Sequence, residues 1–279
     1  MGRKPCLLSL GISLLFVLCA RVSGVYGSRI STQNLPGKYP SLPSHEETAE
    51  KLTKFFFRSD HGPRKLVKRQ ALATFFDIMY ILDSSSSVSD WEFQRAVQAI
   101  QTMVAKSKRD NRHAVITIAT RAKTFMNFSS RADAVRKLRG ISRSGGKTNT
   151  QDALELAFQM FTTSKYGSTP GGLARVLVVT DGRSNIEKHR TERKAFKLKA
   201  NGIEVFVIAI GDYLEGMDEL ARMANTKYAH MYRVEDVKGL ARVVKLIPRL
   251  QEREATNYYG GRPPIEGNAA SNAKLQRHQ

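Results

Sequence analysis

The side chains best suited to chemistry are three oxygen-bearing residues at alternate positions, Asp83, Ser85 and Ser87. They begin where an apolar run over residues 75–82 ends. The aromatic and β-branched residues of that run predict a strand buried on both faces, as in the centre of a parallel sheet. Open α/β sheets bind ligands at the carboxyl ends of such strands. Oxygens of this type are hard donors, which Mg²⁺ or Mn²⁺ prefers.

Two further oxygen donors follow at comparable places in the predicted fold. Thr148 lies in the glycine-rich segment 145–150, and Asp181 follows the apolar run 173–179. Together, two carboxylates and three hydroxyls could hold a divalent cation directly or through water, with one coordination position open. Because only two formal negative charges would face a 2+ ion, the cation would stay electrophilic and would favour a carboxylate from a partner protein.

The alternation of strands and helices over residues 74–250 predicts how these segments meet. Buried strands alternate with amphipathic helices, which is typical of a doubly wound α/β sheet with helices on both faces. Residues 113–119 and 123–128 read as a hairpin that adds an antiparallel edge. We therefore expect a mostly parallel, six-stranded sheet with one antiparallel edge strand.

Boundary signals place several further elements. Ser89 and Glu92 have the spacing of a capping box, which predicts the start of a helix. A helix over residues 186–200 should follow the aspartate loop. A strand over residues 229–234 and a helix over residues 237–247 should close the domain.

This order of motifs resembles the von Willebrand factor type A domain, found in matrilins, several collagens and integrins. The metal-ion-dependent adhesion site of that family combines a DxSxS motif, a threonine from a glycine-rich loop and an aspartate from a TDG loop. The matching residues here are Asp83, Ser85, Ser87, Thr148 and Asp181. The resemblance implies that the hydroxyls contact the metal directly, that the aspartates act partly through water, and that a Glu or Asp of the ligand completes the octahedron.

The same resemblance implies an adhesion module and a cofactor, Mg²⁺, with Mn²⁺ or Ca²⁺ as substitutes. The flanking segment 180–184 looks most like the secreted matrix members. The expected partner is therefore an extracellular matrix protein, such as a collagen or another matrix glycoprotein. The leading hypothesis is a secreted matrix adhesion protein that binds a partner carboxylate through the cation.

Enzyme signatures are incomplete in this chain. The segment 145–148 is similar to a phosphate loop, but the earlier glycine of G-x-x-x-x-G-K-[ST] would fall at Ile141. An aspartyl-phosphate enzyme would use Asp83 as its nucleophile, yet such enzymes usually carry a second aspartate where this chain has Ser85. Neither a G-x-S-x-G nor an H-E-x-x-H motif occurs. We expect a binding protein and not an enzyme.

The N-terminal residues predict secretion to the extracellular space or matrix. Residues 1–24 look like a signal peptide, with a basic start and an apolar run over residues 7–19 that is too short to span a membrane comfortably. Both cysteines, Cys6 and Cys19, lie inside it, so the secreted chain would contain none. A large core must then stabilise the fold without disulfides.

Residues 25–69 and 251–279 flank the predicted domain. The first segment mixes prolines with charged residues, which indicates a pro-segment or linker, apart from a short amphipathic stretch over residues 47–57. It ends in a dibasic pair, so convertase cleavage after Arg69 is one interpretation and a solvated linker is the other. The second segment has little hydrophobic content and predicts a disordered tail.

The chain is strongly basic, with a formal net charge of +20. A field of this size attracts polyanions in a salt-dependent way. For a secreted protein these would be sulfated glycosaminoglycans, acidic matrix proteins or a charged mineral, not nucleic acid. The second hypothesis is therefore a basic structural matrix component, and the alternative is a merely solvated face. The candidate basic surface comprises Arg136, Lys137, Arg139, Arg143, Lys147, Arg190, Lys194 and Lys197.

One N-glycosylation sequon is present, at Asn127-Phe128-Ser129. It falls where a predicted strand meets a loop, which makes the asparagine accessible in the expected fold. We therefore expect Asn127 to be glycosylated.

Overall fold

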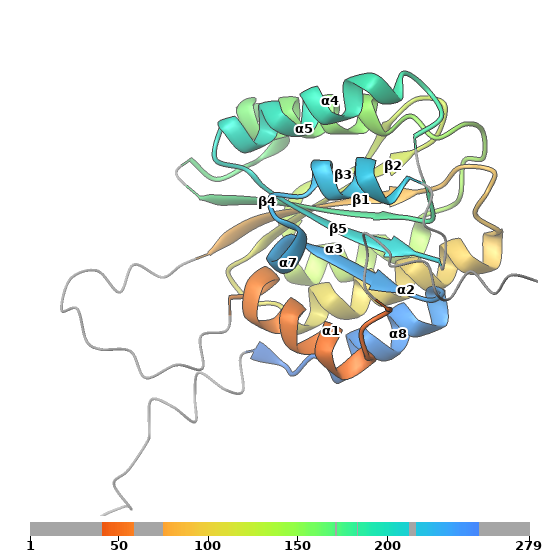
Figure 1. Cartoon of the computed structure of the whole chain (residues 1–279). Coiled ribbons are helices and arrows are strands. Elements are labelled where there is room, and N and C mark those ends of the chain that lie inside the picture. The colour runs from red at the N-terminus through yellow and green to blue at the C-terminus, as the bar shows by residue number, and fades with distance from the viewer. Residues whose placement is uncertain (1–40, 59–74, 171, 183, 212–215, 251–279) are drawn as a thin grey trace, which may run out of the picture. The chain divides into compact units, whose positions relative to one another are not determined.

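The computed structural model describes residues 41–58, 75–170, 172–182, 184–211 and 216–250. One six-stranded sheet crosses this part of the chain, with strand order β3-β2-β1-β4-β5-β6 (Figure 1). Four of the five strand pairings are parallel, and β3 pairs antiparallel with β2. The predicted fold class is confirmed. The strands are β1 (Phe76–Asp83), β2 (Arg112–Ile118), β3 (Lys123–Ser130), β4 (Leu173–Thr180), β5 (Glu204–Ile210) and β6 (Met231–Val234).

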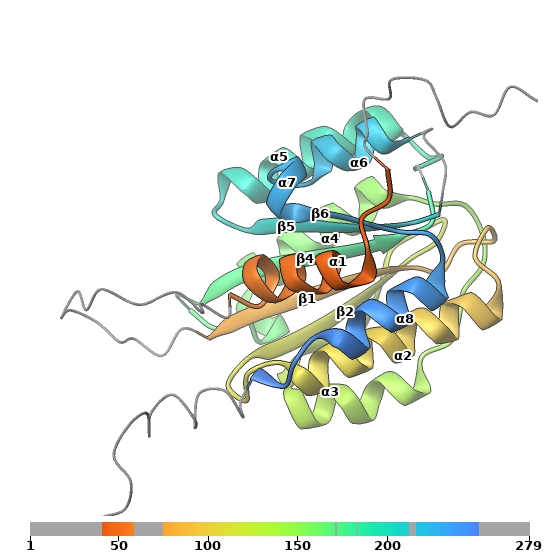
Figure 2. The same ribbon diagram turned by 60° about the horizontal axis from the view of Figure 1, so that its bottom comes forward.

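Helices cover both faces of the sheet, as Figures 1 and 2 show. One face carries α1 (His45–Lys51), α2 (Asp90–Lys106), α3 (Arg131–Lys137) and α8 (Val237–Leu246). The opposite face carries α4 (Thr150–Thr162), α5 (Thr191–Ala200) and α6 (Met217–Met223). The short helix α7 (Lys227–His230) precedes the edge strand β6. No helix among these residues is long and apolar enough to cross a membrane.

The central strand and the first helix form as the sequence predicts. Every residue of β1 is buried, as expected for a strand covered on both faces. At the start of α2, the Ser89 hydroxyl accepts from the Glu92 amide, and the Glu92 carboxylate accepts from the Ser89 amide. This capping box fixes where the helix begins, directly after the polar loop.

Two predicted boundaries are wrong. The helix expected over residues 186–200 begins only at Thr191, because Glu187 adopts a positive φ of 46° and a 3₁₀ turn, Lys188–Arg190, follows it. The strand expected from residue 229 begins at Met231, because the Thr226 side chain caps the short helix α7 before it. In both places a short turn or helix forms first, so the predicted helix or strand begins a few residues later than the hydrophobic pattern indicates.

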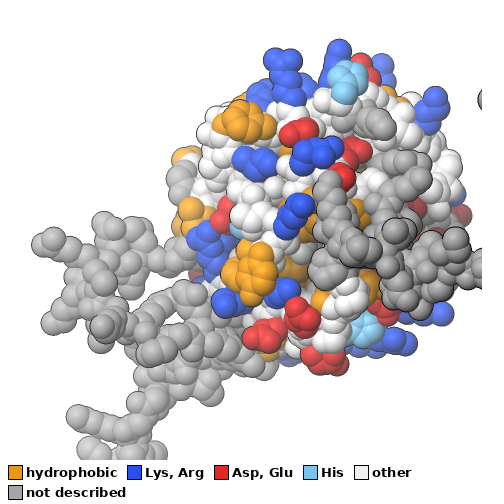
Figure 3. Space-filling model, viewed as in Figure 1, with side chains coloured by type: hydrophobic (Ala, Val, Ile, Leu, Met, Phe, Trp, Pro, Cys, Tyr) orange, Lys and Arg blue, Asp and Glu red, His pale blue; other side chains and the backbone are white. Residues whose placement is uncertain are grey.

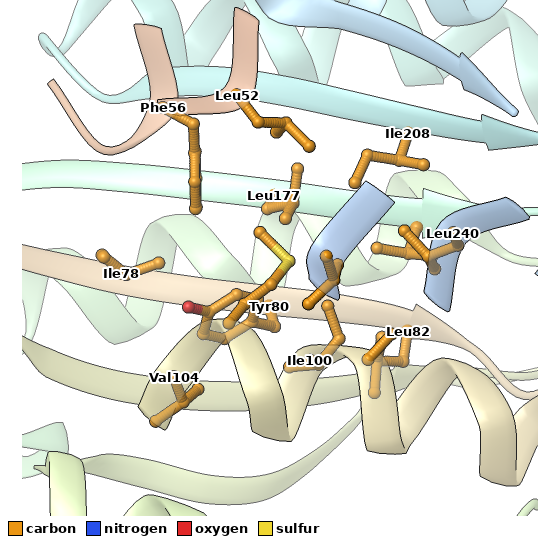
Figure 4. Close-up of a cluster of buried hydrophobic side chains, with 14 of the residues drawn as sticks. Leu52, Phe56, Ile78, Tyr80, Leu82, Ile100, Val104, Leu177, Ile208 and Leu240 are labelled. Carbon is orange, nitrogen blue, oxygen red and sulfur yellow. The ribbon is translucent and has the colours of Figure 1, made fainter. Parts of the chain in front are cut away.

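The N-terminal segment 45–57 packs into the core of the domain. After α1 the chain forms one π-helical stretch, Leu52–Phe56, and the side chains of Leu52, Phe56 and Phe57 are no more than 2% exposed. Figure 4 shows Leu52 and Phe56 extending toward the sheet, where Leu177 and Ile208 lie. Part of the expected pro-segment or linker is thus a layer of the folded unit. Residue Arg69, residues 1–24 and residues 251–279 lie outside the described residues.

A buried arginine ties this segment to the sheet. Arg175 on β4 is fully buried, and its guanidinium lies 3.7 Å from the centroid of the Phe76 ring. Its Nε pairs with Glu204 Oε2 at 2.8 Å, and Nη1 donates to the backbone carbonyl of Phe56. Arg58 reaches the same glutamate. Burial lowers the pKa of Arg175 to about 10, yet the group stays charged at neutral pH because its carboxylate and carbonyl partners compensate it.

Candidate metal site

The end of β1 brings three predicted ligands toward the end of β4. Ser85 and Ser87 lie in the loop after the strand, with their hydroxyl oxygens 3.0 Å apart. The Ser87 hydroxyl donates to Asp181 Oδ1 at 3.2 Å, across from the end of β4. The structure therefore brings two segments together that are separated by 94 positions in the sequence.

Asp83 is held in one orientation at the base of this group. Its Oδ1 accepts from the Ser85 amide at 3.0 Å, and its Oδ2 accepts from the Thr180 hydroxyl at 2.8 Å. The residue is only 6% exposed. Since each carboxylate oxygen can accept more than one hydrogen bond, lone pairs remain for a cation or for its bound water.

Asp181 lies in surroundings that disfavour its negative charge. Burial and then the negative charge of Asp83 raise its pKa to about 6, although the Ser87 hydroxyl acts in the opposite direction. Two carboxylates that repel each other in a partly buried place favour a proton or a cation between them. The donor set thus fits a divalent cation.

The glycine-rich loop reaches this site through backbone hydrogen bonds. The Gly145 amide donates to the Ser84 carbonyl, and the Ser86 amide donates to the Gly146 carbonyl, both at 2.8 Å. Gly146 has a φ of 91°, and a Cβ on it would lie 2.5 Å from the Thr120 hydroxyl. Only glycine fits this close approach without strain.

Thr148 is fixed from the other side of the loop. Its amide donates to Asn185 Oδ1 at 2.8 Å, and its carbonyl accepts from the Ser184 hydroxyl at 3.2 Å. Thr148 is 4% exposed. Because these bonds run to the loop after Asp181, while Gly145 and Gly146 earlier in the same segment bond to the loop after Asp83, Thr148 lies between the two predicted ligand loops.

Some positioning residues were missed from the sequence. Thr180 orients Asp83, Asn185 orients Thr148, and Arg143 Nη1 donates to the Ser85 carbonyl at 3.2 Å. Thr180 is the first residue of the TDG motif, so the motif could have indicated its role in the site. The roles of Asn185 and Arg143 depend on loop contacts that no sequence spacing predicts.

The chemistry of the site depends on hydroxyls. Across the described ranges, no group of three or more His, Cys, Asp or Glu side chains could hold a metal ion. A metal at Asp83 and Asp181 would therefore need the hydroxyl oxygens of Ser85, Ser87 and Thr148. Such an all-oxygen set suits Mg²⁺ or Mn²⁺ and does not suit a thiolate-type zinc site.

The predicted basic surface does not form one continuous face. Arg136 and Lys137 belong to α3, whereas Lys194 and Lys197 belong to α5 on the opposite face of the sheet. Figure 3 shows Lys and Arg side chains along the edge of the molecule that carries α5. The two clusters cannot contact one flat surface together.

Several of these charges are also compensated. Glu155 pairs with both Lys194 and Lys197, at 2.8 and 3.0 Å. The remaining ion pairs are Arg136 with Asp133, Arg143 with Asp90, and Arg190 with Glu187. Within the described residues, no carboxylate contacts Lys137, Arg139 or Lys147. A hollow of about 580 Å³ remains on α5, bordered by Arg193 and the 66% exposed Phe196.

The predicted glycosylation residue lies on the edge strand. Asn127 on β3 is exposed, and its carbonyl accepts from the Ser129 hydroxyl at 2.9 Å. Its side chain is therefore accessible, and glycosylation of Asn127 stays a prediction.

Comparisons with known proteins show the family to which this fold belongs. A family model for the von Willebrand factor type A domain matches residues 77–246. Von Willebrand factor A domain-containing protein 2 of Xenopus laevis is 30% identical over 158 residues, which cover 54% of this chain and 19% of that protein. Matrilin-2 of Mus musculus is 26% identical over 215 residues, which cover 73% of this chain and 21% of that protein. The chain thus matches about a fifth of the length of each relative.

Solved structures show the same fold. Proximal thread matrix protein 1 from the mussel byssus superposes with a TM-score of 0.57 at 23% identity, over 63% of this chain and 47% of that chain. A further structure of the mussel protein, with a zinc occupied MIDAS motif, gives a TM-score of 0.55 at 23% identity, over 64% of this chain and 48% of that chain. At this identity the likeness concerns the fold alone.

Proposed function

The chain belongs to the von Willebrand factor type A domain family, and from this premise we propose that it is a secreted matrix protein that binds a partner carboxylate through a divalent cation. The observation that carries the proposal is the linked group of Asp83, Ser85, Ser87 and Asp181, joined by hydrogen bonds at the carboxyl end of the sheet. We assign the remaining donor to the hydroxyl of Thr148, since hydrogen bonds of its backbone hold this residue between the two ligand loops.

The bound cation would supply an electrophile for the ligand, and the chain's own residues would position it. Ser85, Ser87 and Thr148 offer uncharged hydroxyls, so the two aspartates alone would balance the ion's charge. Because the aspartates would act partly through water, a carboxylate from the partner would be the anion bound directly at the open coordination position. The low count of protein carboxylates therefore favours an acidic ligand over a neutral one.

Matrix location and partner class rest on sequence relatives and on the N-terminal residues. The relatives include matrilin-2 and the collagen alpha-6(VI) chain of Mus musculus, which is 27% identical over 229 residues, 78% of this chain and 10% of that protein. Together with the predicted signal peptide over residues 1–24, they support secretion and a partner such as a collagen or another matrix glycoprotein. The sequence contains neither a G-x-S-x-G nor an H-E-x-x-H motif, so the proposed role is binding without catalysis.

A pull-down from matrix extract tests the proposal. Asp83→Asn and Asp181→Asn remove charge while an amide keeps the shape of each side chain. Asp110→Asn is the control, because Asp110 is exposed in the turn before β2, at the opposite end of the sheet. We expect capture in Mg²⁺ by the wild type and by the control, and loss of capture in chelator or in either site variant.

Capture that resists chelator, or that survives both site variants, would contradict the proposal. The same experiment should include Mn²⁺, Ca²⁺ and Zn²⁺. Zinc is included because the mussel protein was solved with that ion at its MIDAS motif. The oxygen donors predict that Mg²⁺ and Mn²⁺ support capture best.

Polyanion binding by charge is the second candidate function. The observation that favours it is the hollow on α5, where Arg193 has no carboxylate partner within the described residues and Phe196 is exposed beside it. Heparin chromatography tests this function. Elution above physiological salt, reduced in Arg193→Gln and unchanged by chelator, would support it, and elution at or below physiological salt would contradict it.

A further inference from the structure

The metal site has a basic side. Two segments form this side. The β2–β3 hairpin carries Arg121, and the glycine-rich loop carries Lys147 next to Thr148. The Lys147 amide donates to the Thr120 hydroxyl at 3.1 Å, so the two segments are joined by a hydrogen bond. Asn149 adds a second link, because its Nδ2 donates to the Thr120 carbonyl at 3.1 Å.

Both cations on this side are available to a ligand. Arg121 and Lys147 are exposed, and no carboxylate in the described part of the chain contacts either side chain. Consecutive Cα atoms lie about 3.8 Å apart, so Lys147 directly borders a predicted metal ligand. Arg143 strengthens the positive field nearby, although its Nε already pairs with Asp90 at 2.6 Å.

The opposite side of the site carries two carboxylates, together with Lys238 of α8, whose Nζ lies 5.7 Å from the centroid of the Trp91 ring of α2. Glu92 in the first turn of α2 borders the same small cavity as Asp83 and Asp181. Asp236 caps the neighbouring helix α8, where its Oδ1 accepts from the Gly239 amide at 2.7 Å. The two helices lie side by side in Figure 2. Because Glu92 and Asp236 serve as helix caps, their charges are fixed in place and cannot turn away from a ligand.

We propose that the ligand is an acidic polypeptide segment whose additional carboxylates lie on one side only of the residue that meets the cation. Those carboxylates would contact Arg121 and Lys147, and the other flank of the segment would be neutral or basic where it passes Glu92 and Asp236. The inference rests on the proposed function, since the first carboxylate must be held by the metal.

The charge asymmetry favours a polypeptide over a sulfated polysaccharide. A sulfated chain carries negative groups along its whole length. If it lay across the cation, one half would meet Arg121 and Lys147, and the other half would be repelled by Glu92 and Asp236. A polypeptide can place acidic residues on one flank alone.

Synthetic peptides test the inference. Fluorescent glycine peptides with one central glutamate would carry no aspartates, a pair of aspartates before the glutamate, a pair after it, or a pair on both sides. Dissociation constants would be measured by fluorescence polarisation in saturating Mg²⁺. The protein variants are Lys147→Gln, Arg121→Gln and their combination. Arg109→Gln is the matched control, an exposed charge in the turn before β2.

The better one-sided peptide should bind about two- to fivefold tighter than the neutral peptide for each cation that it contacts. The peptide with aspartates on both sides should bind no more tightly than the one-sided peptide. Combining Lys147→Gln with Arg121→Gln should remove the gain, and Arg109→Gln should keep it. The neutral peptide should be indifferent to all of these variants.

Three results would overturn the inference. They are equal binding of the neutral and one-sided peptides, a gain that persists in the combined variant, and tightest binding by the peptide with aspartates on both sides. If these results came with chelator-sensitive binding, the proposed function would stand and only the acidic-flank inference would fail. Binding of every peptide that ignores chelator would remove the proposed function and this inference together.

Discussion

Buried charges at the two ends of the sheet differ in whether groups of the same chain compensate them. At the amino end, Arg175 is fully buried, but Glu204 and the Phe56 carbonyl compensate it and the Phe76 ring packs on it. At the carboxyl end, burial and then the negative charge of Asp83 raise the pKa of Asp181. One end satisfies its charge with groups of the same chain, and the other end does not.

This difference separates stability from function. A compensated buried charge holds neighbouring segments in one arrangement. Removing one partner destabilises the protein, because the other charge then stays buried without compensation. An uncompensated pair of carboxylates costs stability until a cation arrives. Substitutions of Arg175 at the amino end should therefore destabilise the protein without changing metal affinity, and substitutions of Asp83 or Asp181 at the carboxyl end should weaken metal binding without lowering stability.

The largest effect is expected at Phe56, which fills the core from the N-terminal segment. Phe56→Ala should lower the free energy of unfolding by about 3–5 kcal/mol, because it removes a fully buried ring. Phe55→Ala is the matched control, since Phe55 is only partly buried and should cost less. Urea denaturation measures both. Equal midpoints for Phe56→Ala and the wild type would show that the segment is not part of the folded unit.

The next effect is expected at Arg175. Arg175→Ala should cost about 3 kcal/mol, the low end for a broken buried ion pair, because Glu204 keeps its contact with Arg58. Metal affinity, measured by calorimetry, should not change. A variant that keeps its stability but loses metal binding would contradict the separation between the two ends.

A pH-dependent effect is expected at Asp181. In the metal-free domain its pKa is about 6 against an ordinary value of 3.8, so the folded state binds more protons than the unfolded state between these values. The free energy of unfolding should therefore rise by about 2 kcal/mol as the pH falls from 7 through 6 toward 4. Asp181→Asn should remove this rise. Urea titrations in chelator would measure it, and a wild-type slope equal to that of the variant would refute the raised pKa of Asp181.

The smallest effect is expected at Gly146. Gly146→Ala should cost about 1–2 kcal/mol through its positive φ and the contact with Thr120, and it should weaken metal binding by displacing Thr148. Gly140→Ala is the control, because nothing lies within 4 Å of a Cβ there. A thermal melt compares the two. Unchanged melting and metal affinity in Gly146→Ala would mean that the loop tolerates the shift.

The carboxyl end was more predictable from the sequence than the amino end. The ligand residues follow apolar strands directly, so the strand pattern alone places Asp83 and Asp181 at one edge of the sheet. The burial of Arg175 depends on its neighbour across β4 and β5, Glu204, and no spacing along the chain shows that pairing. The sequence shows an amphipathic stretch over residues 47–57, but no pattern along the chain places it against a sheet whose first strand begins at Phe76. The features that could not be predicted depend on contacts between distant residues and on local turns.

Metal binding by the isolated protein tests the proposed cation site most directly. Calorimetric titration with Mn²⁺ should show one ion bound per chain in the wild type and in Arg175→Lys. It should show no binding when Asp83→Asn and Asp181→Asn are combined. Undiminished Mn²⁺ binding in that double variant, or none in the wild type, would contradict a cation site at the end of β1.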